Sequence, residues 1–317
     1  MGCFRNLSAY DMGMDRMVSE KPGLIITGAS GLLGHALCEA ARDSWTVYGV
    51  YRRHKPLMAG LHTIRADLRD RQCHSDLIRT IRPRAIIHAA ANADPLACEK
   101  DAQTSDIINR QVPARLARIC DRSGITYLFT STDLVFDGRQ APYDEFAPTR
   151  PICVYGEHKA LAEAEVLDHC SDALVCRLPL MFGAGPYSGR HFGVQMLNAI
   201  RRNETLKLFE DEFRTPVDVD SAAHGILALL GRAKGVFHLG GHTRISRYDL
   251  GLAMARQLGV DPGIIRPVRI RQMKLAVARA ADCSLVSQKA YNAGYRPASL
   301  QSGLRRFVRR FDQFSLD

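Results

Sequence analysis

From residue 24 onward, short runs of apolar residues alternate with longer segments that suit helices. The apolar runs are 24–27, 46–51, 85–88, 126–130 and 173–177. Runs this short and continuous are typical of strands buried on both faces of a sheet. The predicted helices between them are 32–43, 71–81, 104–123 and 156–169. Strands that alternate with helices predict an α/β fold of the Rossmann type, in which right-handed crossovers build a doubly wound parallel sheet.

The alternation loosens after residue 180, where glycines indicate a loop-rich passage. We expect a first domain at 22–180 and a smaller C-terminal region at 181–317. A further apolar run near 235–240 is expected to return to the sheet of the first domain. Residues 1–21 lack regular periodicity and are expected to form a mobile N-terminal extension.

Composition and charge indicate which kinds of partner the protein binds. The 317 residues are 46% hydrophobic and 24% charged, as in ordinary globular proteins. No apolar run approaches the roughly 18 residues that a membrane-spanning helix needs, so no membrane partner is expected. The formal net charge is +10, and only eight of the 43 basic residues are lysines. These charges are spread along the chain, which argues against a nucleic-acid partner and suits a small anionic substrate.

Nine cysteines are scattered singly, with no CxxC pair and an odd total. This usage favours reduced thiols and a cytoplasmic location over disulfides. Neither the cysteines nor the histidines at 88, 238 and 242 have the spacing of metal ligands, so no metal site is expected.

A glycine-rich turn follows the first apolar run and opens the first predicted helix. Glycine at positions 28 and 31 permits a tight turn and a close approach of a pyrophosphate, while Gly34 lets helix and strand pack closely. The position between strand and helix favours a dinucleotide site over an incidental glycine-rich turn. The residues expected to bind the cofactor here are Gly28, Ser30, Gly31, Leu32, Leu33 and Gly34.

The end of the second predicted strand indicates which dinucleotide binds. An acidic residue would be expected there to hold the ribose 2′-hydroxyl of NAD, but the chain has Arg52 and Arg53 instead. Guanidinium groups can bind the 2′-phosphate of NADP through paired hydrogen bonds. We therefore expect the protein to prefer NADP(H), with NAD(H) as a possible second cofactor. The alternative is that both arginines are simply solvated loop residues.

A candidate catalytic pair lies at the start of the predicted helix 156–169. Tyr155 and Lys159 are four residues apart and share one helix face. A nearby ammonium group would lower the pKa of the phenol and help it to exchange a proton with a substrate oxygen. The YxxxK pattern also occurs by chance, so its value depends on the glycine loop and on Ser131 and Thr132, which follow a predicted strand. A hydroxyl at that strand end can orient a substrate carbonyl.

Together these motifs resemble the extended short-chain dehydrogenase/reductase family, and within it the dTDP-4-dehydrorhamnose reductase branch. The resemblance runs from Leu24 through most of the chain. It implies that 22–180 is the NAD(P)-binding domain and that 181–317 is mainly the substrate-binding region. It further implies the catalytic residues Thr132, Tyr155 and Lys159. The additional cofactor-binding residues that it implies are Asp67, Leu68, Ala89, Ala90, Ala91, Asn109, Tyr155 and Lys159.

The resemblance implies an NADP(H)-dependent reductase of a 4-keto nucleotide-sugar, with Asp133 and Arg214 at the substrate and a homodimer as one compatible assembly. A basic stretch at 266–274 is a further candidate contact for a sugar diphosphate. The chain departs from rhamnose-forming members at Leu134 and Leu180, where those enzymes usually carry Tyr and Trp. The alternative is a non-catalytic, NADP-binding regulatory subunit like that of methionine adenosyltransferase, which belongs to the same branch.

Overall fold

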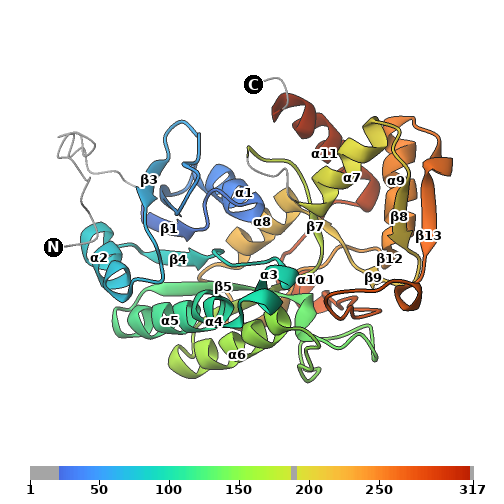
Figure 1. Cartoon of the computed structure of the whole chain (residues 1–317). Helices are drawn as coiled ribbons and strands as arrows, with labels where there is room; N and C mark the ends of the chain where they lie inside the picture. The colour runs from blue at the N-terminus through green and yellow to red at the C-terminus, as the bar shows by residue number, and fades with distance from the viewer. Residues whose placement is uncertain (1–20, 187–190, 315–317) are drawn as a thin grey trace.

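A computed structural model describes residues 21–186 and 191–314 (Figure 1). The expected N-terminal extension at 1–21 therefore lies almost wholly outside the described residues. Seven parallel strands form the central sheet, in the order β11-β6-β5-β4-β1-β2-β3. Their bounds are β1 Gly23–Thr27, β2 Thr46–Tyr51, β3 His62–Arg65, β4 Ala85–His88, β5 Thr126–Thr132, β6 Leu174–Leu178 and β11 Gly235–His238. The doubly wound parallel sheet of the Rossmann type is confirmed.

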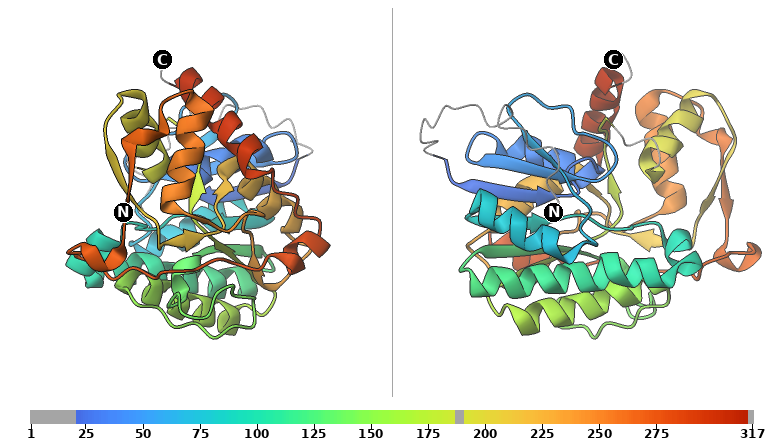
Figure 2. Two further views of the ribbon diagram at one scale, coloured as in Figure 1. Left: turned by 90° about the vertical axis from the view of Figure 1, so that its right-hand side faces the viewer. Right: turned by 60° about the vertical axis from the view of Figure 1, so that its left-hand side comes forward.

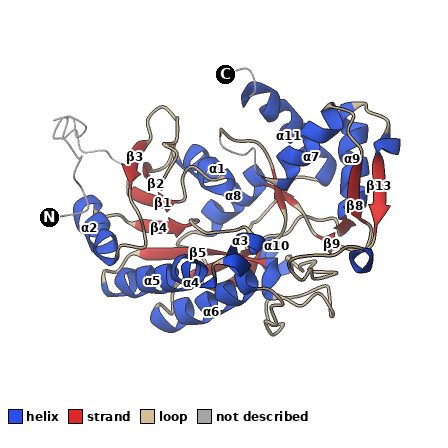
Figure 3. Cartoon of the chain, in the orientation of Figure 1, coloured by secondary structure: helices blue, strands red, loops and turns tan. Residues whose placement is uncertain are grey.

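Helices cover both faces of the sheet, as the parallel pairing requires. On one face, α1 (Leu32–Ala41) packs on α8 (Val219–Leu229), and both contribute to a core that includes Leu37 and Ile226. On the other face lie α2 (Arg71–Ile81), α5 (Val112–Arg122) and α6 (Val154–His169). Figure 3 shows the two helical layers on either side of the strands. β1 occupies the middle, with Leu24 paired to Val47 of β2 and to Ala85 of β4.

The segment predicted as one helix at 104–123 contains three consecutive helical elements. These are α4 (Ala102–Asp106), a π-helical turn η1 (Ile107–Gln111) and α5. A short helix α3 (Pro95–Lys100) precedes them. The apolar spacing gave the extent of the helical segment but not the wider turn, which places Asn109 toward the loop after β4.

The C-terminal part forms a smaller lobe beside the carboxyl ends of the strands (Figure 2). Its helices are α7 (Phe192–Arg201), α9 (Arg247–Leu258) and α11 (Leu300–Phe314), whereas α10 (Gln288–Asn292) packs against β11 of the main sheet. Its strands are the parallel pair β8 (Leu206–Phe209) and β13 (Ile265–Val268), with the short pairs β7 (Met181–Phe182) and β10 (Val217–Asp218), and β9 (Phe213–Arg214) and β12 (Ile245–Ser246). As expected from residues 235–240, β11 leaves this part of the chain and pairs with β6 in the main sheet.

Side chains cap the N-termini of two helices near the carboxyl ends of the strands. The Asp70 side chain accepts a hydrogen bond from the Gln72 N–H at the start of α2, and Asp94 does the same for α3. Among the described helices, none combines the length and the apolar composition that crossing a membrane would require.

Candidate active site

A cleft of about 1480 Å³ separates the carboxyl ends of the sheet from the C-terminal lobe. Parallel α/β sheets bind ligands at this edge because the loops that follow the strands converge there. Fifteen residues expected from the sequence line it: Gly28, Ser30, Gly31, Leu32, Arg52, Arg53, Asp67, Leu68, Ala89, Ala90, Ala91, Thr132, Asp133, Tyr155 and Arg214. Four others do not line it: Leu33, Gly34, Asn109 and Lys159. The structure thus brings most of the predicted site to one cavity.

The glycine-rich turn between β1 and α1 forms one end of the cleft. Gly28 has φ +72°, and a Cβ there would lie 2.8 Å from the Ala90 nitrogen. At Gly34 a Cβ would collide with the Gly28 carbonyl, which is the close helix-to-strand packing expected of this glycine. Gly31 is the N-cap of α1 and provides no side-chain cap. The first N–H groups of α1 therefore stay free to bind an anionic group at the helix N-terminus.

These features fit a bound dinucleotide. The turn can receive a pyrophosphate, and polar atoms farther along the cleft also lack protein partners. Ser131 Oγ and His88 Nε2 are buried without a hydrogen-bond partner among the described residues, and both residues line the cleft. Buried polar atoms are normally paired, so these two are candidate contacts for a ligand.

Hydrogen bonds with the side chains of Thr27 and Asn109 fix the loop after β4. Thr27 Oγ1 accepts hydrogen bonds of 3.1 Å from the N–H groups of Ala89 and Ala90. Asn109 Oδ1 accepts one of 2.9 Å from the Asn92 N–H, and its amide donates to the Asn92 carbonyl at 3.1 Å. Asn109 therefore supports the cofactor loop from outside the cleft, and its direct contact with the cofactor stays a prediction.

The ribose end of the cleft carries the predicted arginines. Arg52 and Arg53 are both exposed and both line the cavity. Asp67, which is expected to bind the cofactor, is hydrogen-bonded to Arg69, and this bond lowers the pKa of the carboxyl. Arg69 also lines the cleft, so three guanidinium groups surround this end.

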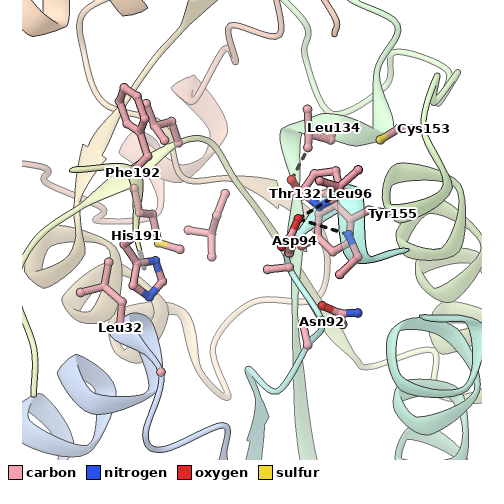
Figure 4. Close-up of a pocket in the computed structure, with 18 of the residues that line it drawn as sticks. Leu32, Asn92, Asp94, Leu96, Thr132, Leu134, Cys153, Tyr155, His191 and Phe192 are labelled. Atoms are coloured by element: carbon pink, nitrogen blue, oxygen red, sulfur yellow. Dashed lines mark hydrogen bonds between the residues drawn. The ribbon is translucent and has the colours of Figure 1, made fainter. Parts of the chain in front are cut away.

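The candidate catalytic residues meet at the end of β5. Figure 4 shows Thr132 and Tyr155 on the same side of the cavity, facing Leu32 and His191 across it. Tyr155 is in the first turn of α6, and Lys159 is one turn later on the same buried face. The Lys159 ammonium donates a hydrogen bond of 2.6 Å to the Thr130 carbonyl and lies 3.8 Å from the Phe129 ring centroid.

One electrostatic expectation is wrong for the chain alone. The pKa of Tyr155 is raised, chiefly by burial and further by electrostatic interactions with Cys98 and Asp133, whereas the sequence predicted a pKa lowered by Lys159. Burial also lowers the pKa of Lys159 to about 7, against the opposing effect of Glu163. A desolvated amine that is often neutral near pH 7 stabilises a phenolate poorly.

Burial of Lys159 predicts a pH-dependent cost to stability. Since the folded-state pKa lies below the unfolded value of 10.5, the unfolded chain binds more protons between about pH 7 and 10.5. Stability contributed by this group therefore rises with pH across that window, and its penalty is complete below pH 7. We expect Lys159→Met to raise the free energy of unfolding by about 1–4 kcal/mol at pH 7. Thermal denaturation should show this gain shrinking toward pH 10; a loss of stability at pH 7 would contradict it.

A cluster of charged residues, most of them buried, forms the cleft wall beyond Thr132. Arg214 Nε lies 3.1 Å from Asp133 Oδ2, and Arg214 Nη2 lies 3.4 Å from Glu212 Oε1. Glu212 also pairs with Arg247 at 3.3 Å and with Arg279 at 3.0 Å. All five residues line the cleft. By contrast, the basic stretch at 266–274 does not line it.

Several cleft residues carry no motif that the sequence analysis used. They are Asn92, Asp94, Leu96, His191, Phe192, Glu212, Arg247 and Arg279. Asp94 followed by proline is a helix-start signal and could have located α3 beside the site. The others come from distant segments, and only the fold places them together. Among the described residues, no group of three or more His, Cys, Asp or Glu side chains could hold a metal ion.

Comparisons with known proteins agree with this geometry. A family model described as RmlD substrate binding domain matches residues 23–313. Methionine adenosyltransferase 2 subunit beta of Xenopus laevis is 30% identical over 253 residues, 77% of this chain and 74% of that protein. The dTDP-4-dehydrorhamnose reductase of Mycobacterium tuberculosis is 28% identical over 289 residues, 89% of this chain and 90% of that protein.

A solved structure provides a further comparison. The dTDP-4-dehydrorhamnose reductase of Bacillus anthracis, in complex with NADP, matches with a TM-score of 0.81 and 24% identity. The match covers 92% of this chain and 99% of that chain. It shows that the two chains share a fold.

Proposed function

The chain belongs to the RmlD substrate binding domain family, and from this premise we propose that it is an NADP(H)-dependent reductase of a 4-keto nucleotide-sugar. The resemblance to the dTDP-4-dehydrorhamnose reductase branch is confirmed, and the chain is an NAD(P)-dependent oxidoreductase of the extended short-chain dehydrogenase/reductase type. The 4-keto sugar and a place in deoxysugar and cell-surface polysaccharide biosynthesis belong to the proposal.

One observation carries the proposal: a single cleft contains the glycine turn, Thr132 with Tyr155, and a cluster of arginines. NADPH, when bound, would supply the hydride for a carbonyl carbon. Tyr155 holds a proton on its phenol oxygen that can pass to the carbonyl oxygen. In this proposal Thr132 would orient that oxygen, and Lys159 would support the site from the buried face of the helix that carries Tyr155.

The far end of the cleft suits the diphosphate of a nucleotide-sugar. Three guanidinium groups there, those of the buried Arg214, the half-buried Arg247 and the exposed Arg279, pair with two carboxylates, those of Asp133 and Glu212. Arg247 Nη1 is buried without a hydrogen-bond partner among the described residues. An anionic substrate would balance the excess positive charge and occupy that donor.

Turnover of a panel of nucleotide-sugars tests this function. We would mix the purified protein with NADPH and dTDP-, UDP- or GDP-activated 4-keto sugars and follow cofactor oxidation. Reduction of at least one 4-keto compound, with the 4-hydroxy product identified by mass spectrometry, is expected. If NADPH binds and no keto-sugar is reduced, the result would favour the alternative hypothesis of a regulatory subunit. The 30% identity to methionine adenosyltransferase 2 subunit beta is the observation behind that alternative.

The cofactor preference gives a prediction of its own. We expect NADPH to bind more tightly than NADH by at least tenfold, since Arg52 and Arg53 line the ribose end of the cleft and each charge-assisted hydrogen bond contributes about 1.5–3 kcal/mol. Calorimetric titration of wild type and of Arg52→Ala with both cofactors measures this. Equal affinities in the wild type would identify the arginines as solvated loop residues and leave the glycine turn unaffected.

The homodimeric assembly and the cytoplasmic location, both expected from the sequence, remain predictions. The eight cysteines in the described part of the chain are free thiols. Sedimentation of the purified protein would decide the assembly.

A further inference from the structure

Large apolar side chains gather at the opening of the cleft. Seven such side chains among the described residues are exposed, and three of them, Leu96, Ile152 and Leu275, line the cleft. Each is between 37% and 39% exposed, so it lies where the cleft meets solvent. Soluble proteins rarely leave apolar groups together at a concave surface unless these groups pack against something in a functional state. The opening of the cleft therefore has an apolar rim.

The rim comes from two separate parts of the chain. Leu96 lies in α3 and Ile152 in the loop before α6, both between strands of the main sheet. Leu275 lies in residues 273–279, which follow β13 and form neither helix nor strand, and which we call the strap. Residues 275–279 of the strap line the cleft. In Figure 1 this part of the chain leads from the lower end of β13 back toward α3. The strap and the rim beside α3 are therefore the two sides of one opening.

Polar contacts fasten the strap at its two ends. Just before it, the Ile270 N–H donates a hydrogen bond of 2.9 Å to Asp211. At its last residue, Arg279 pairs with Glu212 at 3.0 Å. Among the described residues, none makes a hydrogen bond to 274–278. A segment with polar contacts only at its ends can move as a unit at little cost, as loops that close over ligands do.

Resting on the proposed function, we propose that the strap is a lid that closes over a bound nucleotide-sugar. In the closed state Leu275 packs on Leu96 and Ile152, and the burial of these three side chains stabilises closure. Closure also removes water from the place where the hydride and the proton are transferred. The substrate triggers it, because Arg279 at the base of the lid is 43% exposed and belongs to the cluster proposed to bind the diphosphate.

Limited proteolysis tests closure without turnover. Lys274 is exposed in the strap, so trypsin should cut the full-length protein after it. With NADPH present, we expect dTDP-, UDP- or GDP-glucose, none of which carries a keto group, to slow this cleavage at least about tenfold, because a closed lid cannot enter the protease. A thermal shift identifies which of the three binds.

A second trypsin site provides the internal control for this experiment. Lys234 is exposed just before β11, outside the cleft. The same ligand should change cleavage after Lys234 by less than about twofold, because closure of the lid leaves that turn open to the protease. General stabilisation of the protein would instead slow both cleavages alike.

A double-mutant cycle tests the contact itself, with calorimetry in the presence of NADPH. Leu275→Ser and Leu96→Ser should each weaken binding of the nucleotide-sugar by about five- to tenfold, because a buried leucine contact is lost. The melting temperature should hardly change, since both side chains are exposed before the lid closes. The double variant should lose little more than either single variant, because both changes remove the same contact. Leu161→Ser is the matched control, since Leu161 is 45% exposed on α6 and does not line the cleft. It should keep wild-type affinity.

The outcomes separate the lid from the proposed function. Binding of a nucleotide-sugar that leaves cleavage after Lys274 unchanged would overturn the lid alone. A loss in the double variant equal to the product of the two single losses would do the same. If none of the three nucleotide-sugars binds, the lid and the proposed function fail together. If one binds and protects the strap but no 4-keto compound is reduced, the lid stands and the reductase function fails.

Discussion

Replacing Tyr155 with phenylalanine should lower reduction of any accepted keto-sugar by at least about 100-fold, the usual loss when a general acid is removed. The Tyr155 side chain is buried in the first turn of α6, so phenylalanine keeps its packing and removes only the proton that moves. Ground-state binding should survive because the lost interaction belongs to the transition state. Steady-state kinetics beside an NADPH titration would measure both quantities.

Tyr143→Phe is a matched control for this experiment. Tyr143 is also buried, but its hydroxyl donates to Asp137 at 2.7 Å, and it does not line the cleft. Its replacement should cost some stability and leave turnover within about twofold. Undiminished turnover in Tyr155→Phe would show that the proton comes from elsewhere, and the reductase mechanism described here would fail at its centre.

Replacing Gly31 with valine should weaken NADPH binding by at least about 100-fold, or ~2.7 kcal/mol, while the protein still folds. Gly31 has ordinary extended backbone angles, φ −77° and ψ 166°, and a Cβ there would meet only the Gly28 carbonyl oxygen, at 3.2 Å. The chain can therefore accommodate the side chain, but the branched methyl groups would fill the space where a pyrophosphate must approach the helix N-terminus.

Circular dichroism and cofactor fluorescence separate the two effects of this change. Gly31→Ala should give an intermediate affinity, because one methyl group blocks less of the approach. Gly34→Val is the contrasting variant, because a Cβ at Gly34 collides with backbone and should prevent folding. If Gly31→Val also fails to fold, the glycine serves the turn alone and the binding argument loses its support.

Apolar periodicity predicted the sheet well because each inner strand is buried on both faces. The structure gives Thr46–Tyr51 and Ala85–His88 with the predicted bounds. The edge strand His62–Arg65 was not predicted from its own residues, because its side chains are half-buried or exposed and form no continuous apolar run. The π-helical turn at Ile107–Gln111 was missed because apolar spacing over a single turn does not distinguish i→i+5 hydrogen bonds from the i→i+4 bonds of an α-helix.

Some residues of the candidate site could likewise be predicted from the sequence, and others could not. Residues in local motifs, such as Gly28 and Tyr155, could be predicted because one strand-turn-helix or one helix turn sets their geometry. Arg247 and Arg279 could not, because they reach the cleft only when separate segments of the C-terminal lobe close over Glu212. The pKa of Tyr155 also escaped prediction: burial dominates it, and spacing along a helix does not report burial.

The return of β11 to the main sheet makes the two halves of the protein a single folding unit. β6 is bonded to β5 on one side and to residues 235–239, which include β11, on the other. A chain ending near residue 180 would expose an apolar, unpaired strand edge, which invites aggregation. During synthesis the sheet must therefore wait for more than fifty further residues, and such long-range pairing slows folding. We therefore expect a chain truncated near residue 180 to aggregate more readily than the full-length protein.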